Sequence, residues 1–245
     1  MNNRYHLRWV RPALALALLA VLPARSATAQ EVVTGWEGSA SRGYAFVSPA
    51  APFSTRGQFS WLVRGTLSYL YYDFADQGGR TEVRSPGESV AVSLRYSSPQ
   101  ITGSIGLGYE VRQTRRRLAA GDQTRENETG VVVAGDVFYQ ATPLVNLSAI
   151  ASYGDANHYK WARIGAKRQI SNFDNRDSRT MHAGVEVTGQ GNSDGRSVQV
   201  GGLFEIAFPR DHASLQFRTG YSRQNNPDDS HESRPYFGVG YYRAF

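Results

Sequence analysis

The sequence predicts an all-β protein: an antiparallel transmembrane β-barrel of 12 strands, with ten strands as the second choice. Three observations support this fold class. The chain starts with a segment typical of exported proteins, continues through strand-length segments in which apolar and polar residues alternate, and ends on an aromatic residue, Phe245. Together they indicate a barrel that is exported to the cell outer membrane.

The first 29 residues are the predicted signal peptide. Its three parts are a group of arginines, an apolar run and a stretch of small residues, at Arg4, Arg8 and Arg11, at 13–22 and at 27–29. The alternative is a membrane anchor, but the ten residues of the apolar run are only half of the ~20 that a spanning helix needs. We therefore expect cleavage after Ala29.

Removal of this segment leaves 23 basic residues against 21 acidic ones, a net charge of +2. The remaining basic residues are spread through every segment, so no nucleic-acid partner is expected. The chain has no cysteine, so packing and backbone pairing must stabilise it in an oxidising compartment. We expect residues 30–245 to form a single barrel domain.

Alternation with a period of two is clearest in the segment 58–74. Its odd positions carry apolar or aromatic side chains such as Trp61 and Tyr69, and its even positions carry polar ones such as Ser60 and Arg64. Its length suits a membrane strand, which has ~9–11 residues in lipid plus wet extensions. Further strands are predicted at 89–97, 101–111, 129–141, 144–153, 158–170, 180–188, 197–208, 213–223 and 236–245.

The predicted connections alternate in length, as in outer-membrane barrels with short turns on one side and long loops on the other. Short turns are predicted at 98–99, 142–143 and 209–211, and long polar loops at 73–87, 113–127, 189–196 and 224–233. Two connections break the pattern: 171–179 is long where a short turn is expected, and 154–157 is short where a loop is expected.

Parity decides the strand count, because a chain with both ends on the same side crosses the membrane an even number of times. Ten strands are predicted from residue 58 onward. The break at Gly38–Gly43 favours two more, at Val32–Glu37 and Tyr44–Ser48, which gives 12.

The last predicted strand carries a separate signal. Phe237, Val239 and Tyr241 share a face, and the chain stops at Phe245. This resembles the terminal signal of outer-membrane barrels, with Arg243 as a departure at the third position from the end.

Catalysis has no positive support in the sequence, and no enzymatic activity is expected. His158 and His182 lie near strand ends, but no serine lies in a glycine-flanked nucleophile turn. No histidine or cysteine spacing suggests a metal site, and no cofactor is expected. Periodicity places Glu110, Asp136 and Arg64 on the inner face, where we expect charged residues to pair across the lumen.

The segment 159–165 interleaves aromatic and cationic residues. Aromatic faces beside hydrogen-bonding groups often hold sugar rings, so Tyr159, Trp161 and Arg163 are candidate glycan-binding residues. The alternative is that the aromatics mark the membrane interface, because the alternation leaves open which face of this strand points inward.

Arg115, Arg116 and Arg117 cluster in a predicted outer loop. Lipopolysaccharide phosphates would be a natural counter-charge for them. A solvated run of charges is the alternative.

Three short motifs, at 36–40, 159–163 and 238–245, resemble those of the cellulose biosynthesis protein BcsS family. The resemblance covers the whole mature chain. It implies an outer-membrane accessory protein of cellulose (exopolysaccharide) biosynthesis or secretion, surrounded by outer-membrane lipids and lipopolysaccharide, with cellulose or the cellulose synthase/export complex as partner. Two alternatives stay open: a general small porin or structural outer-membrane barrel, and a lipid-modifying barrel enzyme.

Overall fold

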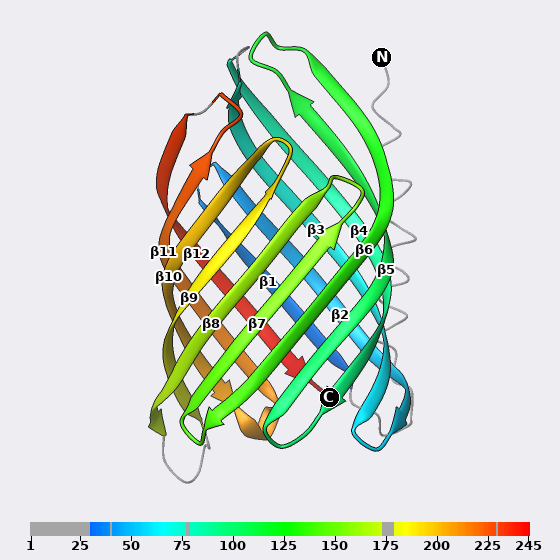
Figure 1. Cartoon of the computed structure of the whole chain (residues 1–245), viewed down its shortest axis with the longest axis vertical. Coiled ribbons are helices and arrows are strands. Elements are labelled where there is room, and N and C mark those ends of the chain that lie inside the picture. Colours follow the sequence, from blue (N-terminus) through cyan, green and yellow to red (C-terminus); the bar gives the residue numbers. More distant parts are fainter. Residues whose placement is uncertain (1–29, 40, 77–78, 173–178, 229) are drawn as a thin grey trace.

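The computed structural model describes residues 30–39, 41–76, 79–172, 179–228 and 230–245, which form a closed barrel of 12 antiparallel strands (Figure 1). The predicted fold class and strand count are confirmed. The predicted signal peptide and most of the connection 171–179 lie outside the described residues. Within the described part of the chain, no helix is long and apolar enough to cross a membrane.

Each strand pairs with its neighbours in sequence, and β1 closes the barrel against β12. Closure leaves no open sheet, so backbone groups inside a membrane find partners within the protein. The strands are β1 (Glu31–Ser39), β2 (Arg42–Arg56), β3 (Phe59–Asp76), β4 (Gly79–Ser97), β5 (Ile101–Arg117), β6 (Gln123–Thr142), β7 (Val145–Gly154), β8 (Tyr159–Asn172), β9 (Thr180–Asn192), β10 (Gly195–Phe208), β11 (Ala213–Asn225) and β12 (His231–Ala244).

We call the end of the barrel that holds Glu31 and Phe245 the terminal end. It also holds the short turns after β4, β6 and β10, where the short connections were predicted; a 3₁₀ helix, η1 (Pro209–Asp211), forms the last of them. We call the opposite end, with the turns after β1, β3, β5, β7, β9 and β11, the loop end.

The prediction of four long loops at the loop end is wrong, because most of the residues assigned to these loops continue the strands. β3 and β4 stay paired as far as Asp76 and Gly79, and β5 and β6 as far as Arg117 and Gln123. The prediction took the change from apolar to polar residues as the end of each strand. Backbone pairing does not depend on that change, since a strand beyond the membrane exposes polar side chains to water at no cost.

The long strands β3 to β6 form a wall that rises above the rest of the loop end (Figure 1). β6 pairs with β7 only from Val132 onward, opposite Gly154, so its first nine residues stand above that neighbour. The rim of the barrel is therefore uneven, and β3–β6 present two faces beyond the membrane: one toward the lumen and one outward.

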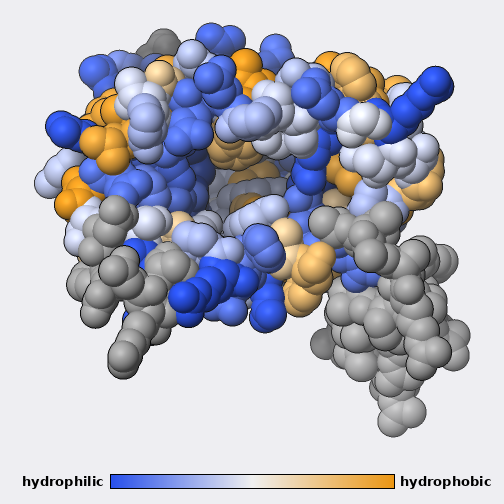
Figure 2. Space-filling model, turned by 90° about the horizontal axis from the view of Figure 1, so that it is seen from below, coloured by the Kyte–Doolittle hydropathy of each residue, from blue (hydrophilic) through white to orange (hydrophobic). Residues whose placement is uncertain are grey.

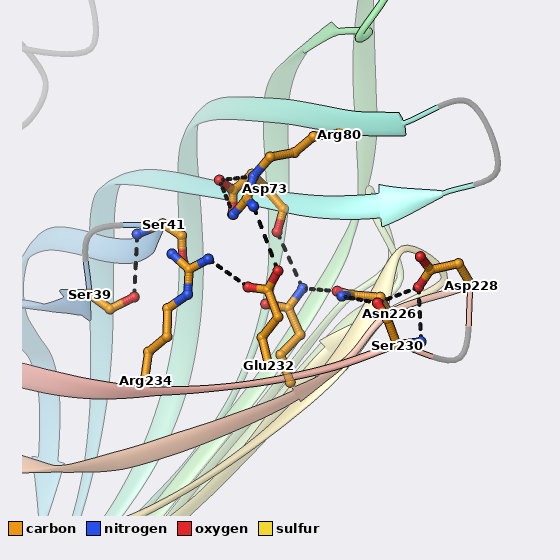
Figure 3. Close-up of polar contacts among 10 residues, drawn as sticks. Ser39, Ser41, Asp73, Arg80, Asn226, Asp228, Ser230, Glu232 and Arg234 are labelled. Atoms are coloured by element: carbon orange, nitrogen blue, oxygen red, sulfur yellow. Dashed lines mark hydrogen bonds and ion pairs between the residues drawn. The ribbon is translucent and has the colours of Figure 1, made fainter.

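A polar cluster joins this wall to the last hairpin at the loop end (Figure 3). The Arg80 guanidinium donates a 2.7 Å hydrogen bond to Asp73 and lies 3.6 Å from Glu232, which also accepts from Arg234 at 2.7 Å. Gln224 of β11 donates to the Asp73 carbonyl oxygen at 3.2 Å. These contacts connect the β3–β4 hairpin with β11 and β12 above the short hairpin of β1 and β2.

Candidate functional site in the lumen

Side chains alternate between a lipid-facing outer surface and a polar lumen along every strand. On β5, Ile105 and Leu107 point outward and are 64% and 62% exposed, whereas Glu110 and Arg112 are buried inside the barrel. Seen from the terminal end, the barrel is hollowed at its centre and hydrophilic residues gather round the hollow (Figure 2). The lumen is therefore the place where this chain can meet a polar ligand.

β8 turns its three candidate residues into the lumen. Its even positions face outward, as the high exposure of Ile164 and Ile170 shows (68% and 58%), so its odd positions, Tyr159, Trp161 and Arg163, face inward. The side that the alternation left open is thereby decided in favour of the lumen.

The three residues are held by different contacts. Tyr159 donates its hydroxyl to Gln190 at 2.8 Å, and the Arg163 guanidinium lies 4.9 Å from the centre of the Trp161 ring. The Arg163 Nε also donates to the Thr188 hydroxyl at 3.0 Å. Partners on the adjoining strand β9, together with the cation–π contact, thus fix how these side chains project into the lumen.

Arg163 is the centre of an ion-pair network that crosses the barrel. Its guanidinium binds Glu37 of β1, although four strands separate β8 from β1 on the shorter path round the barrel. Arg163 also lies 3.6 Å from Glu186, whose other partners are Arg218 at 3.1 Å and the Tyr236 hydroxyl at 3.3 Å. We call these five residues the mid-lumen network.

A second bridge spans the lumen at the loop end. Asp194, in the turn between β9 and β10, accepts hydrogen bonds from the Tyr72 hydroxyl at 2.6 Å and from Arg116 at 2.7 Å. Asn192 also donates to the Tyr72 hydroxyl, at 3.2 Å. Because β3 and β9 lie opposite each other in the barrel, we call this contact the loop-end latch.

The three inner-face charges named from the sequence do point inward and have partners there. Glu110 pairs with Arg112 at 2.5 Å, Arg64 pairs with Glu31 at 2.8 Å, and Asp136 accepts from the Ser104 hydroxyl. Glu31 also binds Arg95, and Glu205 binds Lys167. Glu110 and Arg64 therefore pair with opposite charges, but within one strand or between nearby strands, and Asp136 has a neutral partner. Pairing across the lumen is made instead by Arg163 and Glu37.

Sequence reasoning missed the aromatic residues that face β8 across the lumen. Tyr44 and Tyr72 lie within electrostatic range of Tyr159, as does Arg112. The signal was present in the alternation, since both tyrosines occupy inward positions of β2 and β3. The lumen thus offers aromatic faces on opposite walls near the loop-end latch, to which Tyr72 itself belongs.

The histidines considered for catalysis are far apart. His158 lies in the turn before β8 at the loop end, where its side chain is 70% exposed, whereas His182 is buried in the lumen near the terminal end, 3.7 Å from Glu205. The described residues contain no group of three or more histidine, cysteine, aspartate or glutamate side chains placed to hold a metal ion.

A groove of about 580 Å³ lies on the outer surface, where β10, β11, β12 and β1 adjoin, and includes Trp36, Phe217 and Phe237 among its lining residues. Its lining is almost wholly apolar, and these three aromatics are exposed on the face that meets lipid. The groove belongs to the membrane-facing surface, and Arg218 of the mid-lumen network is also among its lining residues.

Fold and lumen together define a transmembrane β-barrel protein with a polar, aromatic-lined interior. Residues 29–245 match the family described as cellulose biosynthesis protein BcsS, and the chain belongs to that family. Among curated proteins there is no significant match.

Several solved barrels resemble the structure at low sequence identity. The β domain of the Bordetella autotransporter BrkA is 14% identical, with 89% of this chain and 98% of that chain covered and a TM-score of 0.49. The transport unit of the autotransporter AIDA-I from Escherichia coli is 9% identical, with 96% of this chain and 97% of that chain covered and a TM-score of 0.46. LpxR from Salmonella typhimurium is 10% identical, with 88% of this chain and 100% of that chain covered and a TM-score of 0.47. At these values the resemblance does not bear on function.

Proposed function

We propose that this protein is an outer-membrane accessory barrel of cellulose biosynthesis or secretion, and that its lumen contacts the glucan through Tyr159, Trp161 and Arg163. Membership of the cellulose biosynthesis family supports the pathway. The closed barrel with its apolar outer surface, together with the signal-type N-terminus, supports the location.

The observation that carries the glycan contact is the inward orientation of β8. Apolar faces of sugar rings stack on aromatic side chains, and their hydroxyl groups need hydrogen-bonding partners. Trp161 supplies the first, while Tyr159 and Arg163 supply both donors and positive charge. Had these side chains faced lipid, no luminal ligand could reach them.

The mid-lumen network sets a condition on any glucan that enters. A chain that runs the full length of the barrel must part the contact between Arg163 and Glu37, because it crosses the lumen. Sugar hydroxyls can replace part of what this ion pair loses, since they accept hydrogen bonds from a guanidinium and donate them to a carboxylate. The same residues can therefore close the empty lumen and bind the occupied one.

A general small porin is the second candidate, because a polar lumen also suits other small hydrophilic solutes. The lipid-modifying enzyme has less support: His158 and His182 lie at opposite ends of the barrel, so they cannot form one catalytic group.

The test is cellulose output from a producing strain that lacks the native gene and carries Trp161→Ala or Trp61→Ala. Trp61 faces outward and is 46% exposed, so it is a matched control for the loss of a tryptophan. We expect extracellular cellulose to fall with Trp161→Ala and to stay at the wild-type level with Trp61→Ala. Equal output from both variants would contradict the luminal contact, and full output without the gene would contradict the accessory role.

A further inference from the structure

The apolar groove on the outer surface has a floor made of backbone. One cross-strand row of its lining residues runs from β9 to β12 and consists of Gly184, Leu203, Arg218 and Gly238. The side chains of Leu203 and Arg218 point into the lumen, where Leu203 is buried and Arg218 binds Glu186. The other two residues are glycines, so this row presents little more than backbone to the lipid.

The next row toward the terminal end is bulky and forms a wall beside the floor. Its four large apolar side chains point outward from β10, β11, β12 and β1, and they are Phe204, Phe217, Val239 and Trp36. Trp36 and Phe217 are 38% and 44% exposed, as expected of side chains that meet lipid. The groove is therefore bounded on its terminal side by a largely aromatic ridge.

On the loop-end side of the floor, a glycine widens the groove. Gly202 points outward, like Val198 and Val200 on the same strand, which are 54% and 58% exposed. A Cβ on Gly202 would meet nothing nearer than the Gly184 carbonyl oxygen at 3.9 Å. The place of the missing side chain is thus part of the groove. The volume of about 580 Å³ lies in the range of small-molecule sites, about 300–1,000 Å³.

In a bilayer the natural occupant of this space is a lipid acyl chain. An empty groove would lose the dispersion contacts of its lining, and close packing is what drives association inside a membrane. A second barrel is convex on its outer surface, so it would bridge the groove instead of filling it. One acyl chain is narrow and flexible enough to lie along the floor.

A cation lies between the groove and the terminal end. Arg243 is exposed on the outward face of β12, four residues beyond Val239. Its guanidinium lies 4.8 Å from the centre of the Phe245 ring, and within the described ranges no carboxylate lies within 4 Å of it. Arg243 can therefore donate hydrogen bonds to an anion at the surface of the barrel.

The spacing of Arg243 and the groove matches the depth of one leaflet. Four residues rise about 14 Å along a strand, or about 10 Å along the axis of a barrel with a tilt of about 40°. The hydrocarbon of one leaflet is about 15 Å deep, so the groove lies within the hydrocarbon when Arg243 lies at the headgroups. Tyr241 and Phe245 flank Arg243 on the same face, as in the aromatic girdle at a membrane interface.

We propose that the groove and Arg243 together bind one anionic phospholipid of the leaflet around the terminal end, with an acyl chain in the groove and the phosphate on Arg243. The short turns of outer-membrane barrels face the periplasm, where the leaflet consists of phospholipid. Arg243 donates charge-assisted hydrogen bonds to the phosphate. The adjoining turn carries Arg210 and Asp211, whose charges cancel, so the charge of Arg243 favours an anionic headgroup over a zwitterionic one. The site is independent of what the lumen binds.

Trp36 lines the groove and can report on its occupant. In a Trp61→Phe/Trp161→Phe parent barrel, Trp36 is the one tryptophan left in residues 30–245. Bromine atoms on an acyl chain in the groove quench its fluorescence. The barrel is refolded into vesicles of unbrominated phosphatidylcholine that contain an increasing fraction of brominated phosphatidylglycerol or, in a parallel series, of brominated phosphatidylcholine.

Each half of the site has a variant and a matched control in this parent. Gly202→Leu fills the groove, whereas Gly65→Leu adds the same side chain to an outward glycine of β3 whose Cβ would meet nothing within 4 Å. Arg243→Gln removes the cation below the groove. Arg168→Gln removes another exposed outward arginine near the terminal end, on β8.

We expect phosphatidylglycerol to reach half-maximal quenching at about a tenth of the fraction that phosphatidylcholine needs, a preference of about 1.4 kcal/mol. Gly202→Leu should lower the quenching by both lipids, and Arg243→Gln should remove the preference between them. Both controls should behave like the parent. Equal quenching by the two lipids, a preference that survives Arg243→Gln or is lost in Arg168→Gln, or equal quenching in Gly202→Leu and Gly65→Leu would overturn the proposal.

A folding measurement separates a filled groove from a damaged barrel. In neutral detergent, Gly202→Leu should unfold at or above the midpoint of the parent, because its Cβ has room. A lower midpoint would contradict the open space above Gly202. Gly202→Ala adds the Cβ alone, so it should lower the quenching less than Gly202→Leu does. An equal reduction by both variants would show that the effect does not come from filling the groove.

Discussion

Replacement of Glu186 by leucine is expected to destabilise the barrel strongly. Glu186 is 3% exposed and lies 3.1 Å from the Arg218 Nε, 3.6 Å from the Arg163 Nε and 3.3 Å from the Tyr236 hydroxyl. Arg163 keeps Glu37 in the variant, but Arg218 keeps only the neutral Gln216. The substitution therefore leaves the buried Arg218 guanidinium without a carboxylate in hydrogen-bonding contact, with only the longer-range attraction of Glu37.

The magnitude follows from these contacts. A charge pair at about 4 Å is worth about 4 kcal/mol at an effective dielectric constant of about 20, and desolvation of the ions offsets part of this. Removal of one partner of a buried pair typically costs about 3–5 kcal/mol. Leucine cannot accept from Arg218 or Tyr236, so we expect a loss of about 3–5 kcal/mol in the free energy of unfolding.

The assay is urea unfolding of the refolded barrel in lipid vesicles. With a denaturant dependence of about 2 kcal/mol per M, the midpoint should fall by about 2 M. Glu186→Gln keeps a hydrogen bond to Tyr236, so its unfolding midpoint should lie between those of the wild type and Glu186→Leu. Glu82→Gln removes an exposed carboxylate and should stay within about 0.5 kcal/mol of the wild type. If Glu186→Leu matched Glu82→Gln, the mid-lumen network would not stabilise the barrel.

Three further predictions follow from other parts of the structure. Asp194→Ala removes the acceptor of the loop-end latch. We expect the free energy of unfolding to fall by about 1.5–3 kcal/mol and the ion conductance in planar bilayers to rise. An unchanged conductance would show that the latch does not narrow the lumen. The Ser230 hydroxyl, and to a smaller extent its backbone N–H, donate hydrogen bonds to Asp228 and lower the pKa of that carboxyl. These contacts are therefore fully present above the ordinary pKa of 3.8 and are lost as pH falls through the lowered pKa. Measured by NMR, the titration midpoint of Asp228 should rise toward 3.8 in Ser230→Ala, and an unmoved midpoint would refute this cause. A Cβ on Gly43 would lie 2.5 Å from the Tyr71 ring, so Gly43→Ala should cost about 1–3 kcal/mol, and a thermal unfolding midpoint equal to the wild type would contradict this packing.

The fold could be predicted because alternation has a simple physical cause. In a strand that spans lipid, every second residue meets hydrocarbon and the others meet the lumen, so the outward series from Trp61 to Tyr71 identifies β3 directly. The strand ends could not be predicted in the same way. Beyond the lipid both faces of a strand are wet, and residues such as Glu82 and Arg115 no longer reveal whether the backbone is paired.

The orientation of β8 was available in the sequence but not decisive. Ile164 and Ile170 share the even positions, which favours an outward even face, whereas an aromatic such as Trp161 suits either the lumen or the membrane interface. Only closure of the barrel, which places Arg163 against Glu37, decides between them.

The bridges across the lumen lay beyond sequence reasoning. Tyr72 and Asp194 are 122 residues apart, and neither belongs to a recognisable motif. They meet because β3 and the turn after β9 fall on opposite sides of a 12-stranded circle. A ten-stranded barrel from the same pattern would have brought different residues together.

The luminal glycan contact is tested most directly by a fluorescence titration of the refolded barrel with soluble cello-oligosaccharides. In residues 30–245 the tryptophans are Trp36, Trp61 and Trp161, and only the last faces the lumen. A Trp36→Phe/Trp61→Phe variant therefore leaves one luminal reporter. A luminal glycan contact should give a saturable change in the emission of Trp161, and Trp161→Ala in the otherwise wild-type barrel should abolish binding of the sugar. No change at millimolar sugar, or unaltered binding by Trp161→Ala, would contradict a luminal glycan contact.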